Sequence, residues 1–400
     1  MQYPQLTLHP GSEHTVRNGH PWIFSGSVAH KPVTKSGDIV DVIDSKKRFV
    51  CRGTYNARAM IRVRALTRNP NEKIDEHFIT QRLIDAMEYR KKNNIYSYTN
   101  AIRLIHGEAD GLPGLIVDDY AGFLVVQFHT LGMENLKDPI LNALENVLKP
   151  KGIYERSDVG TRRSEGLKNR PTGKLRGAAP PEFVDIVEHD VNLSVDIYRG
   201  QKTGFFIDQR ANRLQLQKLA SQRHVLNLFS YSSAFSAHGL KGGAKSTLDV
   251  DISVSSPHAA KRNIEKNRGN CLKTNRVVAD AFTFIATLAT KGPRYDIVVV
   301  DPPSLVRKRE KNSIKKALGV YTKLNRNALR SIHSGGIIMT SSCSTPVTNE
   351  DFFNMISRAA VGAKVDLRII SIGSNCPDHP IDPFFPDGRY LKTITAEVLR

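Results

Sequence analysis

The sequence has few cysteines and no long hydrophobic segment, and both absences limit what the protein can be. Its 400 residues include 4 cysteines, and none of them forms a Cys-x-x-Cys pair. This excludes a disulfide-stapled scaffold and a cysteine-rich zinc module, so we expect no metal site and a protein of the reducing cytoplasm. The longest apolar runs are strand-sized, far below the roughly 20 residues that a membrane helix needs. The start also lacks the pattern of a signal peptide, so we expect neither a membrane segment nor secretion.

Acidic residues are scarce relative to basic ones. Lys and Arg together number 58 against 39 Asp and Glu, which gives a formal net charge of +19. A surplus of this size favours a polyanionic partner, and nucleic acid is the first candidate; the alternative is a basic surface that serves only solubility. Hydrophobic residues make up 40% and charged residues 24% of the chain, as in ordinary folded domains.

Hydrophobic periodicity divides the chain into three segments. Residues 1–70 consist of short β-rich runs and turns, which predict a small β-barrel. A helix is expected over residues 76–92, within a middle α+β domain that covers 71–190. Inside that domain, residues 161–181 are rich in Gly, Pro and basic side chains and predict a mobile loop. The third segment, 191–400, has a different and more regular pattern.

In the third segment, strand-like runs alternate with helix-length segments. The runs start at Val225, Thr247, Arg276, Asp296, Gly336, Val365 and Leu391. This βα alternation predicts an α/β fold with a doubly wound, mainly parallel sheet of seven strands. Ligands of such sheets bind outside the carboxyl ends of the strands, so the candidate site lies where these runs end.

The turn after the first of these strands lacks the glycine pattern of dinucleotide-binding folds. Residues 229–234 read Phe-Ser-Tyr-Ser-Ser-Ala instead of Gly-x-Gly-x-x-Gly, which argues against an NAD or FAD enzyme. Asp251 ends the second strand, about 22 residues later, where a carboxylate suits a ribose diol. Asp280 ends the third strand, where an acid often meets an adenine amino group, although a helix N-cap is the more frequent role of such an acid.

The fourth and fifth strands end in residues that carry chemistry. Asp301-Pro302-Pro303-Ser304 follows the fourth strand, and Cys343 follows the fifth. A free cysteine is most often an inert buried residue, but one level with Asp301 at the ligand edge is a candidate nucleophile. Basic residues come after the double proline, and they suit either a solvated helix start or a grip on phosphate. The expected RNA-binding residues among them are Arg307, Lys308, Arg309 and Lys311.

Several motifs together resemble a bacterial family of S-adenosylmethionine-dependent methyltransferases that form 5-methylcytosine in large-subunit ribosomal RNA. The matching segments are residues 20–26 and 53–56 for its N-terminal PUA domain, 153–158 for its middle domain, 200–210 for its most specific signature, and 378–380 with 385–392 for its C-terminal end. The resemblance implies a class I methyltransferase fold preceded by an RNA-binding PUA barrel and a middle α+β domain. It also implies S-adenosylmethionine as cofactor and 23S ribosomal RNA as partner. A homodimer is left open.

The resemblance also assigns roles to residues. The expected cofactor-binding residues are Gln209, Arg210, Phe229, Ser230, Tyr231, Asp251, Asp280 and Asp301, and the expected catalytic residues are Cys343 and Asp301. The family usually has Thr-Gly-Gly after Phe-Ser-Tyr, whereas this chain has Ser-Ser-Ala at 232–234, which places side chains where the methionine part of the cofactor is expected to pass.

The implied mechanism begins with addition of a thiolate at C6 of cytosine, which activates C5 for methylation. Asp301 is expected to hold the N3 or amino edge of the base, and the group that removes the C5 proton is not identified. Two other functions remain open. One is an RNA guanine N-methyltransferase, which needs no thiol but commonly has an aromatic residue after Asp-Pro-Pro, where this chain has Ser304 and Leu305. The other is a non-catalytic RNA-binding factor of ribosome assembly.

Overall fold

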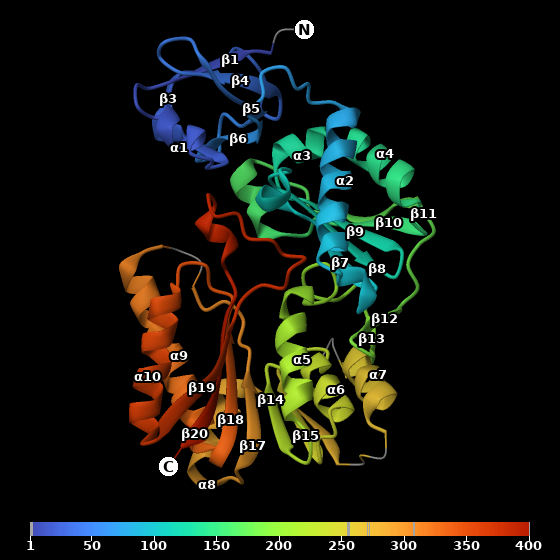
Figure 1. Cartoon of the computed structure of the whole chain (residues 1–400), viewed down its shortest axis with the longest axis vertical. Helices are drawn as coiled ribbons and strands as arrows, with labels where there is room; N and C mark the ends of the chain where they lie inside the picture. Colours follow the sequence, from blue (N-terminus) through green and yellow to red (C-terminus); the bar gives the residue numbers. More distant parts are fainter. Residues whose placement is uncertain (1–2, 254–256, 270, 272, 307–308, 400) are drawn as a thin grey trace. The chain divides into compact units, whose positions relative to one another are not determined.

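The chain divides into two compact units (Figure 1). The computed structural model describes residues 3–253, 257–269, 271, 273–306 and 309–399. Unit 1 comprises Met1–Val184, Gly200–Phe205 and Pro377–Gly388, and unit 2 comprises Asp185–Arg199, Phe206–Cys376 and Arg389–Arg400. In the region of the expected boundary after residue 190, the two units divide between Val184 and Asp185. The division into three domains remains a prediction.

Unit 1 begins with a six-stranded sheet that corresponds to the expected N-terminal barrel. Its strands are β1 (Gln5–Leu8), β2 (Trp22–Phe24), β3 (Val28–His30), β4 (Ile39–Ile43), β5 (Phe49–Tyr55) and β6 (Ile61–Thr67), in the order β2-β6-β5-β4-β1-β3, with helix α1 (Glu13–Arg17) after β1. Alternate residues such as Leu6 and Leu8, and Val40 and Val42, are fully buried, as period-2 strands with one inward face require.

The rest of unit 1 contains a five-stranded sheet and three helices. The strands are β7 (Ala101–His106), β8 (Leu115–Tyr120), β9 (Phe123–Phe128), β10 (Gly152–Arg156) and β11 (Thr172–Gly177), in the order β11-β10-β9-β8-β7, and the helices are α2 (Glu76–Lys92), α3 (Leu131–Asn135) and α4 (Lys137–Leu148). Helix α2 covers the residues expected from the sequence. It starts at Asp75, whose carboxylate accepts a hydrogen bond from the Phe78 N–H at 3.0 Å.

The prediction of a loop over residues 161–181 is wrong in part. Residues 160–165 form a 3₁₀ turn, and β11 (Thr172–Gly177) pairs with β10 in antiparallel fashion. β11 is an edge strand that is nowhere fully buried, so its sequence needs no apolar alternation and gave no strand signal.

Unit 2 contains the seven-stranded sheet expected from the βα alternation. Its strands are β14 (His224–Leu228), β15 (Ser246–Asp251), β16 (Thr274–Val278), β17 (Tyr295–Val300), β18 (Ile332–Ser342), β19 (Asp366–Gly373) and β20 (Lys392–Leu399), in the order β16-β15-β14-β17-β18-β20-β19. β14 to β18 pair in parallel, whereas β20 lies between β18 and β19 and is antiparallel to both. This order confirms the α/β doubly wound fold.

Helices cover both faces of this sheet (Figure 1). They are α5 (Arg210–Leu219), α6 (Ala234–Lys241), α7 (Pro257–Asn267), α8 (Ala281–Lys291), α9 (Lys311–Arg330) and α10 (Asn349–Ala363), and a hairpin of β12 (Val184–Glu188) and β13 (Val191–Val195) joins α7. In β17, Val298 packs with α8, α9 and α10, whereas Ile297 and Val299 pack with α5 and α6. The strand is therefore buried on both faces and apolar throughout, as parallel strands usually are.

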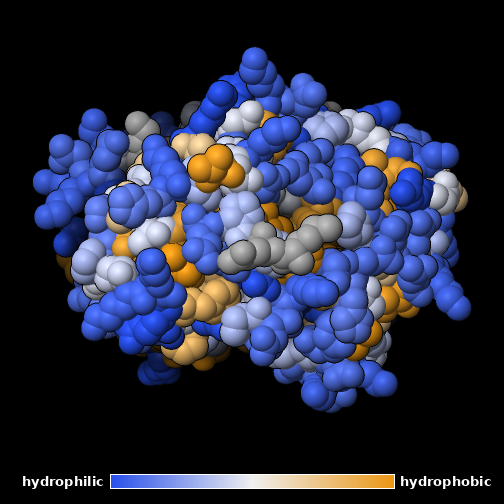
Figure 2. Space-filling model, turned by 90° about the horizontal axis from the view of Figure 1, so that it is seen from above, coloured by the Kyte–Doolittle hydropathy of each residue, from blue (hydrophilic) through white to orange (hydrophobic). Residues whose placement is uncertain are grey.

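In the face shown in Figure 2, most side chains are hydrophilic and the hydrophobic ones form small separate patches. Among the described residues, no helix is both long enough and apolar enough to span a membrane.

Candidate active site

The strands of unit 2 bring most of the expected site residues to one edge. The parallel pairing sets Leu228 opposite both Val250 and Val300, and Val300 opposite Thr340. The residues that follow these positions leave the sheet on the same side. The turn at 229–231, Asp251, Asp301 and Cys343 therefore meet at the carboxyl edge, where doubly wound sheets bind ligands.

The turn after β14 is held by Asp251. One carboxylate oxygen of Asp251 accepts from the Tyr231 N–H at 2.8 Å, and the other accepts from the Ser253 N–H at 2.7 Å. Phe229 and Tyr231 have φ values of 59° and 45°, in the left-handed region that residues other than glycine rarely adopt. These contacts fix the turn and still leave lone pairs on the carboxylate, since each oxygen has two.

The serine that replaces the family's glycine fits into the turn. Ser233 has φ 59°, is fully buried, and hydrogen-bonds through its side chain to Asp249 beneath helix α6. Asp249 also accepts from Asn227 Nδ2 at 2.8 Å and from Ser236 Oγ at 2.6 Å, and burial raises its pKa. The two acids of β15 thus have different surroundings, because Asp249 lies inside the unit and Asp251 lies at the edge.

Asp301 and Gln209 are in direct contact. The Gln209 side chain, at the end of a 3₁₀ turn over Ile207–Gln209, donates to Asp301 Oδ1 at 2.8 Å. Its amide oxygen accepts from Asn212 Nδ2, and Asn212 donates in turn to Thr393 Oγ1 at 3.0 Å. This chain of hydrogen bonds connects Asp301 to β20, so the carboxylate is oriented by groups far from it in sequence.

Arg210 and Asp280 have other partners in the structure. The Arg210 guanidinium is buried, with its Nε 3.5 Å from Glu188 on β12, next to the pair formed by Glu188 and Arg213. Asp280 is exposed and caps helix α8, where it accepts from the Thr283 N–H at 2.8 Å. Their expected contacts with a cofactor remain predictions.

Cys343 lies half-buried in a loop that is attached to the loop after Asp301. The hydroxyls of Ser342 and Ser344, on either side of it, both hydrogen-bond to Tyr321 Oη at 3.0 Å. Ser344 Oγ also accepts from the Leu305 N–H at 3.2 Å, directly after Ser304 of the Asp-Pro-Pro-Ser motif. These bonds hold the segment that carries the thiol against the segment that begins with Asp301.

The other cysteines lie in surroundings that do not suit a nucleophile. Cys51 is fully buried in the N-terminal sheet, and burial raises its pKa to about 12. Cys376 is buried and donates to the Asp208 carbonyl at 3.1 Å. Cys271 donates to the Lys245 carbonyl at 3.3 Å.

One residue that contacts the loop of Cys343 was not expected from the sequence. Lys392, the first residue of β20, pairs with Ser342, and its Nζ donates to the carbonyls of Ser344 at 2.8 Å and Val347 at 2.6 Å. Burial lowers its pKa to about 8. The sequence signal was a lysine at the start of a mostly apolar strand, but only the insertion of β20 beside β18 shows what this lysine contacts.

The structure describes two of the four residues that are expected to bind RNA. Arg309 precedes α9 and Lys311 is its first residue, whereas Arg307 and Lys308 lie outside the described residues. Lys311 lines a groove of about 470 Å³ between α9 and α10, together with Lys315 and Arg358. The cations in this groove outnumber its acid, Asp351, so it suits a phosphate chain.

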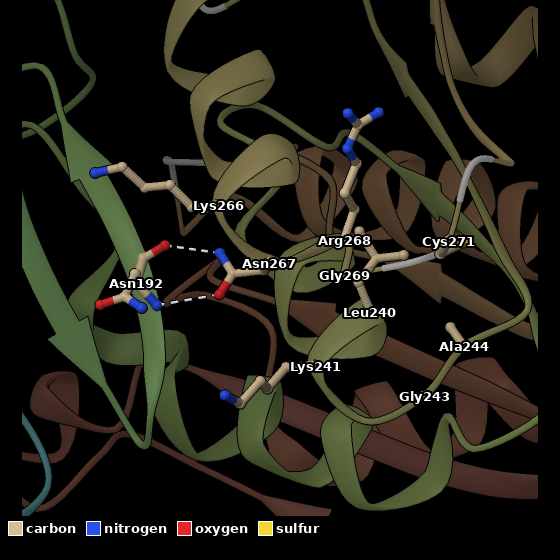
Figure 3. A pocket seen from close by; sticks show the side chains of 10 residues that line it. All are labelled: Asn192, Leu240, Lys241, Gly243, Ala244, Lys266, Asn267, Arg268, Gly269 and Cys271. Atoms are coloured by element: carbon tan, nitrogen blue, oxygen red, sulfur yellow. Dashed lines mark hydrogen bonds between the residues drawn. The ribbon is translucent and has the colours of Figure 1, made fainter.

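A second pocket lies away from the carboxyl edge. Figure 3 shows it beside α6 and α7. Its volume is about 450 Å³. Two of its lysines are in ion pairs, Lys241 with Asp190 at 3.4 Å and Lys266 with Asp185 at 2.5 Å. Asn267 fastens this region to β13 through hydrogen bonds with both backbone groups of Asn192. These contacts indicate that the region has a structural role and joins α7 to β13.

The doubly wound fold and the polar residues at its carboxyl edge are compatible with a methyltransferase, and comparison with known proteins identifies this class. A family model described as S-adenosylmethionine-dependent methyltransferase matches residues 161–384, and a model for a PUA-like domain matches residues 6–68. The chain is 36% identical over 400 residues to the ribosomal RNA large subunit methyltransferase I of Escherichia coli strain SMS-3-5, with 99% of each chain covered. It belongs to this family of S-adenosylmethionine-dependent methyltransferases.

Solved structures show the same fold along the whole chain. SMU.776, named as a methyltransferase complexed with SAH, superposes with a TM-score of 0.85 at 24% identity, covering 99% of this chain and 100% of that one. A structure named as an S-adenosylmethionine-dependent methyltransferase from Streptococcus mutans gives a TM-score of 0.84 at 23% identity, with the same coverage.

Proposed function

We propose that the protein transfers a methyl group from S-adenosylmethionine to C5 of a cytosine in 23S ribosomal RNA. The observation that carries this proposal is the position of Cys343, which stands at the carboxyl edge in a loop bonded through Ser344 to the segment after Asp301. The ribosomal substrate is supported by the name of the Escherichia coli relative, ribosomal RNA large subunit methyltransferase I. A ribosomal substrate also favours a cytoplasmic location for the protein. The comparisons lend no support to a homodimer.

The thiol is the feature that suits cytosine C5. This carbon is a poor nucleophile within an aromatic ring. When the Cys343 thiolate forms a bond to C6, the aromaticity is lost and electron density moves to C5. Asp301, held by Gln209, can support the N3 side of the base and supply the proton that addition requires. After methylation at C5, transfer of the C5 proton to a base allows the C6–S bond to break and releases the thiolate, and N3 returns its proton to Asp301.

The residues at the carboxyl edge of the sheet suit the binding of S-adenosylmethionine. When bound, S-adenosylmethionine supplies an electrophilic methyl group. Asp251 is suited to hold a ribose, because its two backbone contacts leave lone pairs for hydroxyl donors. The turn at 229–231 stands beside it and can line the remainder of the molecule.

Asp251→Ala is expected to weaken binding of S-adenosylmethionine about 10- to 100-fold, because hydrogen bonds to a charged group contribute about 1.5 to 3 kcal/mol. Calorimetric titration measures the dissociation constant, and circular dichroism checks folding. An unchanged constant in a folded variant would remove Asp251 from the site. Asp280→Ala is the companion variant. If Asp280 only caps α8, its loss lowers stability by about 1 kcal/mol and leaves cofactor affinity intact.

Arg309→Ala combined with Lys311→Ala is expected to reduce the salt dependence of RNA binding. Each phosphate contact to single-stranded RNA adds about 0.7 to the slope of log affinity against log salt, so losing two should lower the slope by about 1.4. Lys261→Ala, an exposed lysine on α7, is the matched control. Fluorescence anisotropy between low and moderate salt measures both. An equal slope in wild type and double variant would place the phosphate contacts elsewhere.

Two alternative functions are weaker on structural grounds. A guanine N-methyltransferase would have no use for a thiol, and the position after Asp-Pro-Pro holds Ser304, whose hydroxyl bonds to Ser344 at 3.1 Å. A non-catalytic assembly factor would not require Asp301 to be oriented by Gln209 next to the cysteine loop.

A further inference from the structure

Lys392 is anchored to the short loop that carries Cys343. Its backbone pairs with Ser342, the residue before the cysteine, and its Nζ donates to the carbonyls of Ser344 and Val347, which come after it. The lysine side chain thus contacts the loop on the C-terminal side of the thiol, while its own backbone borders the N-terminal side. Only 4% of Lys392 is exposed.

The number of donors on Lys392 allows two protonation states. An ammonium has three N–H groups, and the two carbonyls use two of them. A neutral amine has two N–H groups and one lone pair, so it can keep both carbonyl bonds as well. The two states differ only at the third position on nitrogen, which holds a proton in one state and a lone pair in the other.

The surroundings of Lys392 bring these two states close in energy. Within the described part of the chain, Lys392 makes no ion pair with a carboxylate, and burial of an uncompensated cation is costly. Its pKa falls to about 8, near the value of about 8.5 for a free thiol. Lys392 can therefore be neutral or charged near neutral pH, and a negative charge on Cys343 favours its charged form.

We propose that Lys392 is a positioning residue that accepts the proton of Cys343 and then stabilises the thiolate as its counter-ion. The S–H bond breaks and an N–H bond forms, so a thiol and an amine become a thiolate and an ammonium with no further reactant. The inference rests on the proposed function, since it explains how the nucleophile is formed. It also explains why a lysine is buried where β20 begins.

Other charged or titratable groups among the described residues also act on this pair. Tyr321 on α9 bonds to Ser342 and Ser344, and burial raises its pKa above the ordinary value. Asp351 of the α10 capping box favours the charged lysine, and Arg389 opposes it. Between pH 6 and 9.5 we expect the pair of Cys343 and Lys392 to dominate the pH dependence of the reactivity of Cys343.

The test is alkylation of Cys343 by iodoacetamide in the full-length protein, followed by mass spectrometry of the peptide that contains it. Lys392→Met should move the midpoint of the pH profile upward by about one unit or more and slow alkylation at pH 7 about tenfold. Lys392→Gln retains two N–H donors for the carbonyls without a charge and should shift the profile similarly. Lys323→Met, on the surface of α9, serves as the control. Superimposable profiles for wild type and Lys392→Gln would overturn the inference.

Methyl transfer provides the second measurement. Both Lys392 variants should lose rate at pH 7, recover part of it at higher pH, and bind S-adenosylmethionine with wild-type affinity. The alkylation experiment does not depend on the identity of the RNA target. If the pH profile shifts but Cys343→Ala still methylates RNA, the proposed function fails while the activation of the thiol stands. If Cys343→Ala is inactive and the profile does not shift, only the role of Lys392 fails.

Discussion

Cys343→Ala should abolish formation of 5-methylcytosine while leaving the affinity for S-adenosylmethionine nearly unchanged. The thiol forms the covalent bond at C6 without which C5 does not attack, so its removal eliminates the pathway. Cofactor binding should survive because the cysteine serves the base, whereas Asp251 and the turn at 229–231 stand further along the sheet edge. Labelled methyl transfer to ribosomal RNA from cells that lack the gene, combined with calorimetry, measures the two properties.

The matched controls are the other three cysteines. Cys271→Ala removes a thiol that donates to the Lys245 carbonyl, and the variant should retain activity. Cys51 and Cys376 are buried, and their Ala variants should also methylate RNA, although each opens a small cavity. Loss of activity in a well-folded Cys271→Ala variant would contradict the assignment of the nucleophile.

Trapping the covalent intermediate gives an independent test. RNA with 5-fluorocytosine at the target carries a fluorine where the enzyme would remove a proton, so the adduct should persist. A protein–RNA complex that resists denaturation is expected with wild type and not with Cys343→Ala. If the target is stacked or paired, the base must first be flipped out, at a cost of a few kcal/mol. Active wild-type enzyme without any trapped adduct would favour the guanine N-methyltransferase.

Local patterns were sufficient to predict most of the elements, although not the edge strand β11, and the edge of the sheet at which the candidate site lies. Helix α2 has its apolar period and its Asp75 cap within a few residues of each other, and β17 is a continuous apolar run bounded by turns. Both signals are short-range, so the sequence displays them directly. The positions of Asp251, Asp301 and Cys343 follow from the same logic, since each one follows or ends a strand of a parallel sheet.

The contacts that tune the site depend on long-range pairing, which the order of the chain does not reveal. β20 is the last strand in sequence, yet it inserts between β18 and β19 and brings Lys392 to the cysteine loop. Arg210 shows a different limit. It follows Gln209 in the signature, but successive side chains at a helix start point in different directions, so one contacts Asp301 and the other Glu188.

Asp301→Asn should lower the rate of methyl transfer by about 10²- to 10⁴-fold, the usual contribution of a positioned acid or base. The amide has nearly the same size as the carboxylate but cannot hold the proton that addition at C6 requires, so the loss should appear in the single-turnover rate. Asp301 is also expected to line the cofactor, and the shape retained by Asn should keep the dissociation constant of S-adenosylmethionine within a few-fold. Stopped-flow mixing of the preformed complex with RNA measures the step.

Gln209→Leu tests how much the orientation of the Asp301 carboxylate contributes to the rate, because the carboxylate itself remains. The variant keeps Asp301 but removes the 2.8 Å hydrogen bond that orients it, so the rate should fall less than in Asp301→Asn. Formation of the 5-fluorocytosine adduct should slow in parallel with methyl transfer in both variants, because the proton is needed when sulfur adds to C6. If adduct formation keeps the wild-type rate in Asp301→Asn while methylation is lost, Asp301 acts after the addition. In that case its partner in the reaction is the cofactor or the C5 proton instead of N3.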